Sequence, residues 1–493
     1  LVVKKKDNIY TIQTNHRIQS SAEHRFFTVE NFAVKEVRAA ELQKGQFIAH
    51  GFNLALEGDL QRLPQIFQEK LVSVTPEGTQ MILQTLSEHQ TTREALCKNL
   101  KITPRQLRRV LHQQSPTNKE NIDLLIAQRV PENLLEKTKD VFTHKHRDVI
   151  LPEQLTPEFA QLLGYFLGDG NFEKRSIRFK DQRRDVLETY RQIALQLFHV
   201  DGKIRKITDK RCYELALNSK TVCDLFFQID QHLFDLIGKS PKTHIGAFLR
   251  GFFDADGSIN GRTGFVSAAQ RDDDVAVTIQ LYLDRLGIRS RLRRYIHNGN
   301  TINQLDIRDN KSLLFYYDQI GFTARDKQRQ LKNKIDVIET TNRLTPVRRK
   351  EINEFFRNLG LYPSNILSSR NYEYVGEEEL KGVVDFLLRF EHHTLESREK
   401  LSFLISLLHS ELSWERVHSI VVQETDALFY DFGAGNLQNY LANGFCVHNS
   451  QTRIYLRKGK KGSRVAKLID SPYLPDAECA FRITENGIED VED

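Results

Sequence analysis

Cysteine, methionine and long apolar runs are all scarce in this sequence of 493 residues. The five cysteines are scattered and form no Cys-x-x-Cys pair, so neither a disulfide framework nor a zinc site is indicated. No apolar run approaches the length of a membrane span, and no charged start followed by an apolar core and a cleavage site is found. We therefore expect a soluble, cytoplasmic protein with no membrane partner.

The single methionine is Met81, and the chain opens with Leu-Val-Val. The natural start of translation is therefore expected ahead of Leu1, as in a piece of a longer protein. At about 150 residues per domain, the length predicts three or four compact units.

The net charge is only +6, but positive residues gather in short runs. These runs are "RQLRR" at 105–109, "RSRLRR" at 289–294 and "RKGKKGSR" at 457–464. They suit the phosphate backbone of a nucleic acid, although any one of them is equally well a solvated face.

Both ends of the sequence alternate apolar and polar side chains. Residues 1–50 and 417–449 do so in short runs separated by turn residues, which predicts antiparallel strands. Because the residues between them are mostly helical in pattern, we expect one small β domain split into two halves, residues 1–70 and 412–449.

Helical spacing also predicts spacer segments at 71–150 and 336–411. Within the first, residues 91–114 contain a Thr-Pro at 103–104 that can open a second helix, with basic residues along it. A DNA-binding helix-turn-helix and a plain helical hairpin both fit this pattern.

The centre of the chain repeats itself, since "LLGYFLGDGNF" at 162–172 returns as "LRGFFDADGSI" at 249–259. In each copy, small residues four positions apart would let two helices approach closely. A glycine after each acid is placed to end the helix, so Asp169 and Asp256 are expected side by side. Paired carboxylates suit Mg²⁺ and phosphodiester hydrolysis. One copy alone would favour a helix cap, whereas two copies favour catalysis.

These two motifs resemble the signature helices of the LAGLIDADG homing endonucleases. The resemblance implies a pseudo-two-fold αββαββα domain over residues 151–335, which cuts both strands of double-stranded DNA. It assigns Asp169 and Asp256 to metal binding. Earlier in the motif, the first copy has Leu167 where the second has Asp254, but this position is not the catalytic one.

The same resemblance suggests basic residues for catalysis and DNA contact. Lys239 and Lys242 lie where the family often has a basic residue before the second helix, although each is equally well a surface lysine. The candidate DNA contacts, on expected strands, are Arg178, Lys180, Arg291 and Arg293.

Reactive side chains adjoin in "NYLANGFCVHNS" at 439–450. The Asn449 side-chain amide can attack its own carbonyl carbon, which closes a succinimide and breaks the next peptide bond. His448 can assist proton transfer, and the Ser450 hydroxyl can accept an acyl group. A bare tripeptide of this kind is most often ordinary loop sequence.

The residues around this tripeptide favour reactive chemistry over ordinary loop sequence. "LFYDFGAGNLQNYLANGFCVHNS" resembles the C-terminal splicing blocks of inteins, and "IQSSAEHRFFTV" with "VKEVRAAELQKGQFIAH" resembles the N-terminal ones. The resemblance implies a split all-β splicing (Hint) domain that needs no cofactor. Its first nucleophile, a Cys or Ser, and the upstream host segment are expected ahead of Leu1.

The intein resemblance also assigns roles. His24 polarises the N-terminal scissile amide, with Ser21 where threonine is usual, and Asp431 couples the steps. His448 assists the reaction of Asn449, Asn449 cyclises, and Ser450 is the first residue of the host segment. Gln438 stands where many inteins have a further histidine.

Residues 450–493 resemble the C-terminal end of archaeal RadA recombinases, through "LIDSPYLP" and "FRIT" followed by "GIED". This implies that residues 450–493 are a RecA-like fragment of a host recombinase. It also implies that the intein is inserted in that host directly before Ser450. The expected protein is α+β and multidomain, and its endonuclease substrate is the intein-free recombinase gene. The alternatives are a DNA-binding maturase or regulator with an inactive nuclease, or a passive insert in a working recombinase.

Overall fold

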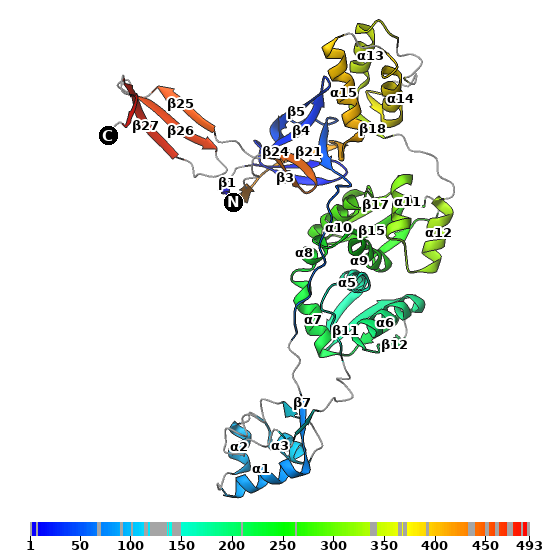
Figure 1. Ribbon diagram of the computed structural model, residues 1–493, viewed down its shortest axis with the longest axis vertical. Helices are drawn as coiled ribbons and strands as arrows, with labels where there is room; N and C mark the ends of the chain where they lie inside the picture. The colour runs from blue at the N-terminus through cyan, green and yellow to red at the C-terminus, as the bar shows by residue number, and fades with distance from the viewer. Residues whose placement is uncertain are drawn as a thin grey trace. The chain divides into compact units, whose positions relative to one another are not determined.

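The fold is known from a computed structural model (Figure 1). It describes residues 2–5, 8–66, 71–88, 92–99, 102–112, 117–118, 136, 138–140, 149–208, 211–261, 264–335, 343–362, 367, 372–390, 394–431, 439–448, 453–458, 463–470, 477–484 and 487–490. Chain contacts divide it into two compact units, Leu1–Glu57 with Asp256–Asp493, and Gly58–Ala255. Among the described residues, every helix is too short or too polar to cross a membrane.

Strands from both ends of the chain pair in the first unit, as the sequence predicts (Figure 1). One sheet has the order β21 (Ser419–Glu424), β2 (Asn8–Gln13), β3 (Arg17–Ser20). A second has the order β20 (Leu412–Arg416), β6 (Phe47–Gly51), β24 (Phe445–His448), β4 (Arg25–Glu30), β5 (Ala33–Arg38), with β23 (Asn439–Ala442) on β24. A pair joins β1 (Val2–Lys5) to β22 (Leu428–Asp431), and the short η1 is Ala39–Glu41.

The core of this β domain is apolar and draws on both ends. Ile12, Phe26 and Ile48 from the first strands pack with Phe445 and Val447 from the last, and all five are buried. Because alternate residues of a strand face the same side, the period-two pattern of each segment supplies one apolar face to this core.

The first unit also contains a repeated half-domain. Its sheet has the order β14 (Gly257–Ile259), β15 (Val266–Gln270), β17 (Asn300–Ile307), β16 (Arg291–His297). Its helices are α10 (Asp273–Arg285), α11 (Asn310–Gln319) and α12 (Arg325–Ile335). An Asp at the N-cap begins both α10 and α11, accepting hydrogen bonds from backbone amides of the first turn.

A mostly helical segment follows, with a core of its own. It comprises β18 (Leu344–Arg348), α13 (Arg349–Asn358), β19 (Tyr374–Gly376), α14 (Glu377–Leu387) and α15 (Leu395–His409). The last strands form a separate antiparallel sheet in chain order, β25 (Arg453–Lys458), β26 (Arg464–Asp470), β27 (Ala477–Thr484), β28 (Gly487–Asp490).

In the second unit, the segment expected to be a helical spacer contains strands as well as helices. Helices α1 (Pro76–Glu88), α2 (Arg93–Asn99) and α3 (Pro104–Leu111) adjoin the sheet β8 (Thr117–Asn118), β7 (Leu71–Val74), β9 (Thr138–Asp140). The hairpin α2–α3 forms where the Thr-Pro predicts it, and Leu96 and Leu107 lie in its core. Arg105, Arg108 and Arg109 on α3 are exposed.

The rest of the second unit repeats the half-domain topology. Its sheet has the order β10 (Gly170–Glu173), β11 (Ser176–Asp181), β13 (Tyr213–Leu217), β12 (Lys203–Lys206). Its helices are α5 (Pro157–Asp169), α6 (Arg184–Phe198), α7 (Lys220–Asp230), α8 (Leu233–Gly238) and α9 (Lys242–Ala255). In chain order, α9 is the first helix of the second copy, so each copy runs helix, two strands, helix, two strands, helix.

Two glycines let the motif helices α5 and α9 touch along their backbones. A Cβ added at Gly164 would lie 1.9 Å from the Phe248 carbonyl oxygen, and one added at Gly251 would lie 1.9 Å from the Gln161 carbonyl oxygen. Glycine costs about 1 kcal/mol in a helix relative to alanine, and close packing offsets that cost. The prediction of closely packed motif helices is confirmed.

We predict that Gly164→Ala destabilises the second unit by about 1–3 kcal/mol, because the added carbon overlaps a backbone atom that cannot move alone. The measurement is the urea midpoint of unfolding. Gly261→Ala is the control, since nothing lies within 4 Å of a Cβ there. Equal midpoints for the two variants would contradict the packing argument.

Candidate functional site

Backbone pairing brings together the two segments predicted to form the splicing domain. In the pairing of β24 with β4, His448 lies opposite Arg25 and Val447 lies opposite Phe26. His24 directly precedes Arg25, so both predicted histidines lie at the same end of this strand pair. The His24 ring is 6.3 Å, between centroids, from that of Tyr440 on the neighbouring β23.

A carboxylate stands beside His448. Glu36 Oε1 is 3.7 Å from His448 Nε2, and Glu36 Oε2 accepts a 2.5 Å hydrogen bond from Arg25. His448 is partly buried, and its ring lies 6.2 Å from that of Phe27. Glu36 can therefore orient the imidazole or stabilise its protonated form, a role that the sequence did not reveal.

Several of the other residues predicted to take part in splicing lie wholly or partly outside the described residues. Asn449, Ser450 and Gln438 lie outside the described residues. Asp431 ends β22, where its backbone pairs with Val2, and its side chain is outside the described part. The Ser21 carbonyl accepts a 3.2 Å hydrogen bond from the His24 backbone, which shapes the turn before β4.

The two motif acids end their helices as expected. Asp169 is the last residue of α5, and Asp256 directly follows α9; both are partly buried. Asp256 accepts a hydrogen bond from Gln270, and Lys327 donates one of 2.5 Å to the next carbonyl, that of Gly257. Asp169 belongs to the second compact unit and Asp256 to the first.

Asp254, the other acid of the second motif, is a packing residue. It is fully buried, and its Oδ2 accepts a 2.6 Å hydrogen bond from Tyr190. Its carbonyl accepts from Arg183 at 3.1 Å. Burial, and then the Asp254 charge, raise the pKa of Tyr190 well above its usual value. This environment agrees with assigning catalysis to another position.

Strand register identifies site residues that the sequence alone did not. In each half-sheet, the glycine after the acid pairs with a residue of the next strand: Gly170 with Phe179, and Gly257 with Ala268. Two positions further on stand Asp181 and Gln270 respectively. Asp181 is held by Arg183 and by the Tyr165 hydroxyl at 3.1 Å. The two copies therefore differ chemically at this position.

The predicted DNA-contact residues lie on strand faces turned away from the cores. On β11, Arg178 and Lys180 alternate with buried Ile177 and Phe179. Arg178 donates a 2.5 Å hydrogen bond to buried Glu214. Burial would raise the pKa of Glu214, but Arg178 and Arg205 hold it below its usual value.

The same alternation occurs on β16, where Arg291 and Arg293 are exposed and Leu292 is buried. Arg293 and Arg308 both donate to buried Asp306, at 2.5 and 2.8 Å. One buried carboxylate on each sheet therefore orients arginines on its open face.

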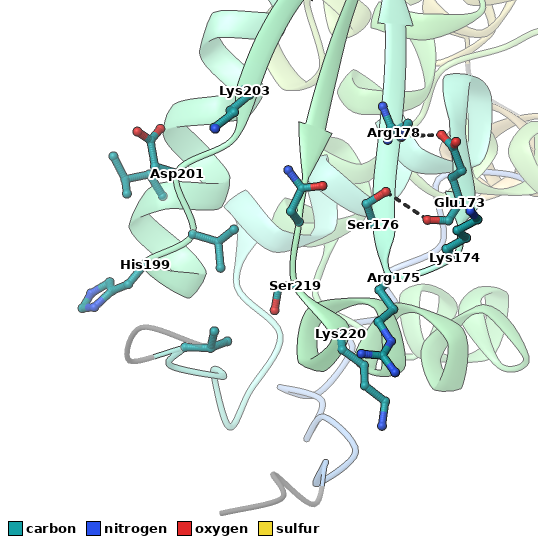
Figure 2. Close-up of a pocket in the computed structure, with 14 residues that line it drawn as sticks. Glu173, Lys174, Arg175, Ser176, Arg178, His199, Asp201, Lys203, Ser219 and Lys220 are labelled. Carbon is teal, nitrogen blue, oxygen red and sulfur yellow. Dashed lines mark hydrogen bonds and ion pairs between the residues drawn. The ribbon is translucent and has the colours of Figure 1, made fainter. Parts of the chain in front are cut away.

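Beside β11 lies a hollow of about 910 Å³, and five of the fourteen residues that line it are Lys or Arg (Figure 2). Figure 2 shows Arg178 turned toward Glu173, whose carbonyl also accepts from Ser176. The basic lining residues are Lys174, Arg175, Arg178, Lys203 and Lys220. This surface continues the positive face of the half-sheet.

The two lysines predicted before the second motif helix differ in position. The Lys239 Nζ pairs with Asp235 Oδ2 at 2.8 Å on the exposed surface. Lys242 begins α9 and is partly buried. An exposed intrahelical pair of this kind costs little to break, so Lys239 stays available to another anion.

Two family models match different, overlapping parts of the chain. A family model described as the intein splicing domain matches residues 1–449, and one described as Rad51 matches residues 416–491. The chain is 30% identical over 331 residues to glutamine–fructose-6-phosphate aminotransferase of Methanocaldococcus jannaschii, covering 62% of this chain and 28% of that protein. It is 63% identical over 70 residues to the DNA repair and recombination protein RadA of Methanococcus voltae, covering 14% and 20%.

The chain spans less than a third of the length of the curated relatives it matches. Among solved structures, the homing endonuclease I-DmoI in complex with DNA and Ca is 16% identical. That alignment covers 36% of this chain and 97% of I-DmoI, with a TM-score of 0.30.

Proposed function

Because this chain belongs to the intein splicing domain family, we propose that its β domain cleaves the bond after Asn449 and, in the complete gene product, splices. The observation that carries the proposal is the pairing of β4 with β24, which places His24 and His448 at one end of one strand pair. We assign this cleavage and splicing to the cytoplasm.

The proposed cleavage is an intramolecular substitution. The Asn449 side-chain nitrogen bonds to the Asn449 carbonyl carbon, the bond from that carbon to the Ser450 nitrogen breaks, and a succinimide forms. The attacking nitrogen loses one proton as the ring closes, and the departing amine gains one, which His448 can deliver while Glu36 stabilises its charged ring. In splicing, Ser450 accepts the acyl group, His24 polarises the upstream amide and Asp431 couples the steps.

The host is proposed to be a RadA-type recombinase that continues from Ser450. The 63% identity to RadA of Methanococcus voltae supports this assignment. Over 331 residues the chain is also similar to an aminotransferase, a protein of unrelated name, which agrees with an inserted element. The joined host, a DNA-dependent ATPase, would carry out recombination.

We predict that the purified chain loses residues 450–493 over time, as intact-mass spectrometry would show. Asn449→Ala should abolish the release, and Glu36→Gln should slow it by about tenfold, since assisted proton transfer contributes at least that much. Glu30→Gln is the control, because Glu30 pairs with Lys35 on the same hairpin. An intact wild-type chain after long incubation would contradict the proposal.

A second function is proposed for the inserted half-domains, namely Mg²⁺-dependent cleavage of double-stranded DNA at the intein-free recombinase gene. The matched half-sheets and the glycine contact of α5 with α9 support it. The partly buried carboxylates of Asp169 and Asp256 offer the oxygen ligands that Mg²⁺ prefers. When bound, the ion would stabilise charge on the phosphate and its leaving oxygen.

The remaining residues of this proposal orient the Asp256 carboxylate or bind the DNA. Gln270 fixes the Asp256 carboxylate, and Lys239 or Lys242 would face the scissile phosphate. The DNA backbone would lie along the open strand faces, where it meets Arg178, Lys180, Arg291 and Arg293.

We predict that the protein cuts duplex DNA carrying the uninterrupted recombinase sequence and that EDTA prevents this. Asp169→Asn and Asp256→Asn should each lower the rate by at least about 100-fold, because each removes a charged metal ligand. Asp318→Asn, at an exposed position of α11, is the control. Wild-type protein that binds this DNA without cutting it would instead favour the maturase or regulator.

A further inference from the structure

Outside both proposed sites, four buried ionisable side chains meet in the first unit. His16 lies between β2 and β3, His50 is on β6, Glu415 is on β20 and Asp284 is on α10. Each is at most 4% exposed. Buried charges are rare unless they are paired or bind a metal ion, so this cluster requires a physical explanation.

The geometry centres on the Asp284 carboxylate. His16 Nε2 is 2.7 Å from Asp284 Oδ2, and His50 Nε2 is 3.7 Å from the same oxygen. The two imidazoles stack with centroids 4.0 Å apart. Donor atoms of His16, His50 and Asp284 all lie within 4.8 Å of one another. Three donors of these types within that distance of one another are what a transition-metal site requires.

His50 is the unexplained member of the cluster. Both of its ring nitrogens are buried, and neither has a hydrogen-bond partner among the described residues. Leaving a buried polar group unpaired costs about 1–3 kcal/mol. Beside the ring, a Cβ at Gly444 would fall 2.2 Å from His50 Nε2, so the glycine keeps that edge of the imidazole free of any side chain.

The other face of His16 is held by Glu415. Glu415 Oε1 is 2.8 Å from His16 Nδ1, and Glu415 Oε2 accepts from the Thr14 hydroxyl. Metal-binding histidines almost always donate their second ring N–H to a carboxylate or carbonyl, which fixes the tautomer and the ring orientation. Glu415 therefore supplies the outer contact that a metal-binding His16 needs.

We propose that His16 Nε2, His50 Nε2 and Asp284 bind a transition-metal ion of the Zn²⁺ class, with Glu415 orienting His16. Two imidazoles and a carboxylate suit this class of ion. The ion would satisfy the unpaired His50. The partly buried Arg289, whose guanidinium lies 4.1 Å from the centroid of the Phe52 ring, adds positive charge nearby and should weaken cation binding.

Without an ion, the same cluster is an ion pair. Burial would lower the pKa of His16, but Asp284 and Glu415 raise it to about 10. Burial, and then the neighbouring His16, lower the pKa of His50 to about 4. In that state a proton on His16 takes the place of the metal between the carboxylates, and His50 remains neutral and unpaired.

The site would fasten the insertion to the β domain. His16, His50 and Glu415 belong to strands or turns of the β domain, whereas Asp284 belongs to α10 of the inserted half-domain. Hydrogen bonds already cross this junction, from Gln280 Nε2 to the Asn15 carbonyl at 3.0 Å and from the Asn53 amide to the Asp284 carbonyl at 2.9 Å.

The test uses the full chain with Asn449→Ala, so that it does not depend on cleavage. After treatment with a chelator, the protein is dialysed against Zn²⁺, and bound metal is counted by mass spectrometry. We expect about one ion per chain that resists a second dialysis. Asp284→Asn and His50→Gln should weaken binding more than about tenfold, and Glu415→Gln by about 10–100-fold. His244→Gln, at a buried histidine near the Leu155 carbonyl, is the control.

A ligand swap guards against variants that merely misfold. With Co²⁺, His50→Cys should retain the ion and gain a thiolate-to-cobalt charge-transfer absorption, whereas His244→Cys should not. No retained ion in the parent chain, or equal binding in His50→Gln and His244→Gln, would overturn the proposal and leave the proton-bridged ion pair. Binding that only Asp169→Asn or Asp256→Asn abolishes would also overturn it.

Discussion

The backbone pairing of β4 with β24 is the contact on which the rest of the structure depends. It joins residues near the start of the chain to residues directly before Asn449, and it completes the core around Phe26 and Val447. Without it, His24 and His448 would belong to separate segments. Each predicted splicing role therefore presupposes a sheet that neither end of the sequence can form alone.

Such pairing tolerates a large insertion for a physical reason. The entropy cost of closing a loop grows only with the logarithm of its length, and a folded insert adds less because its own ends are fixed. The inserted half-domains build their own cores, and the α5–α9 contact is made between backbones rather than with the β domain. The two proposed activities, splicing and DNA cleavage, could then be lost independently of one another.

The sequence predicted what periodicity and repetition encode. Alternating residues at both ends indicated the strands, and the glycine spacing indicated closely packed helices. It did not indicate Gln270 or Asp181, whose equivalence depends on strand register. Nor did it indicate the cluster of His16, His50 and Asp284, because ligands from distant segments leave no spacing pattern. The strands β7, β8 and β9 were missed because they are short and all three lie in the segment predicted to be a helical spacer.

The most direct test of the central claim is hydrogen exchange in a chain carrying Val447→Pro. Proline removes a backbone donor and is incompatible with an inner strand, so it should break the pairing of β24 with β4. If the two ends form one domain, peptides containing Arg25 and Phe26 should lose protection together with those of β24. Unchanged protection at Arg25 and Phe26 would show that the first strands fold without the last and would contradict the account.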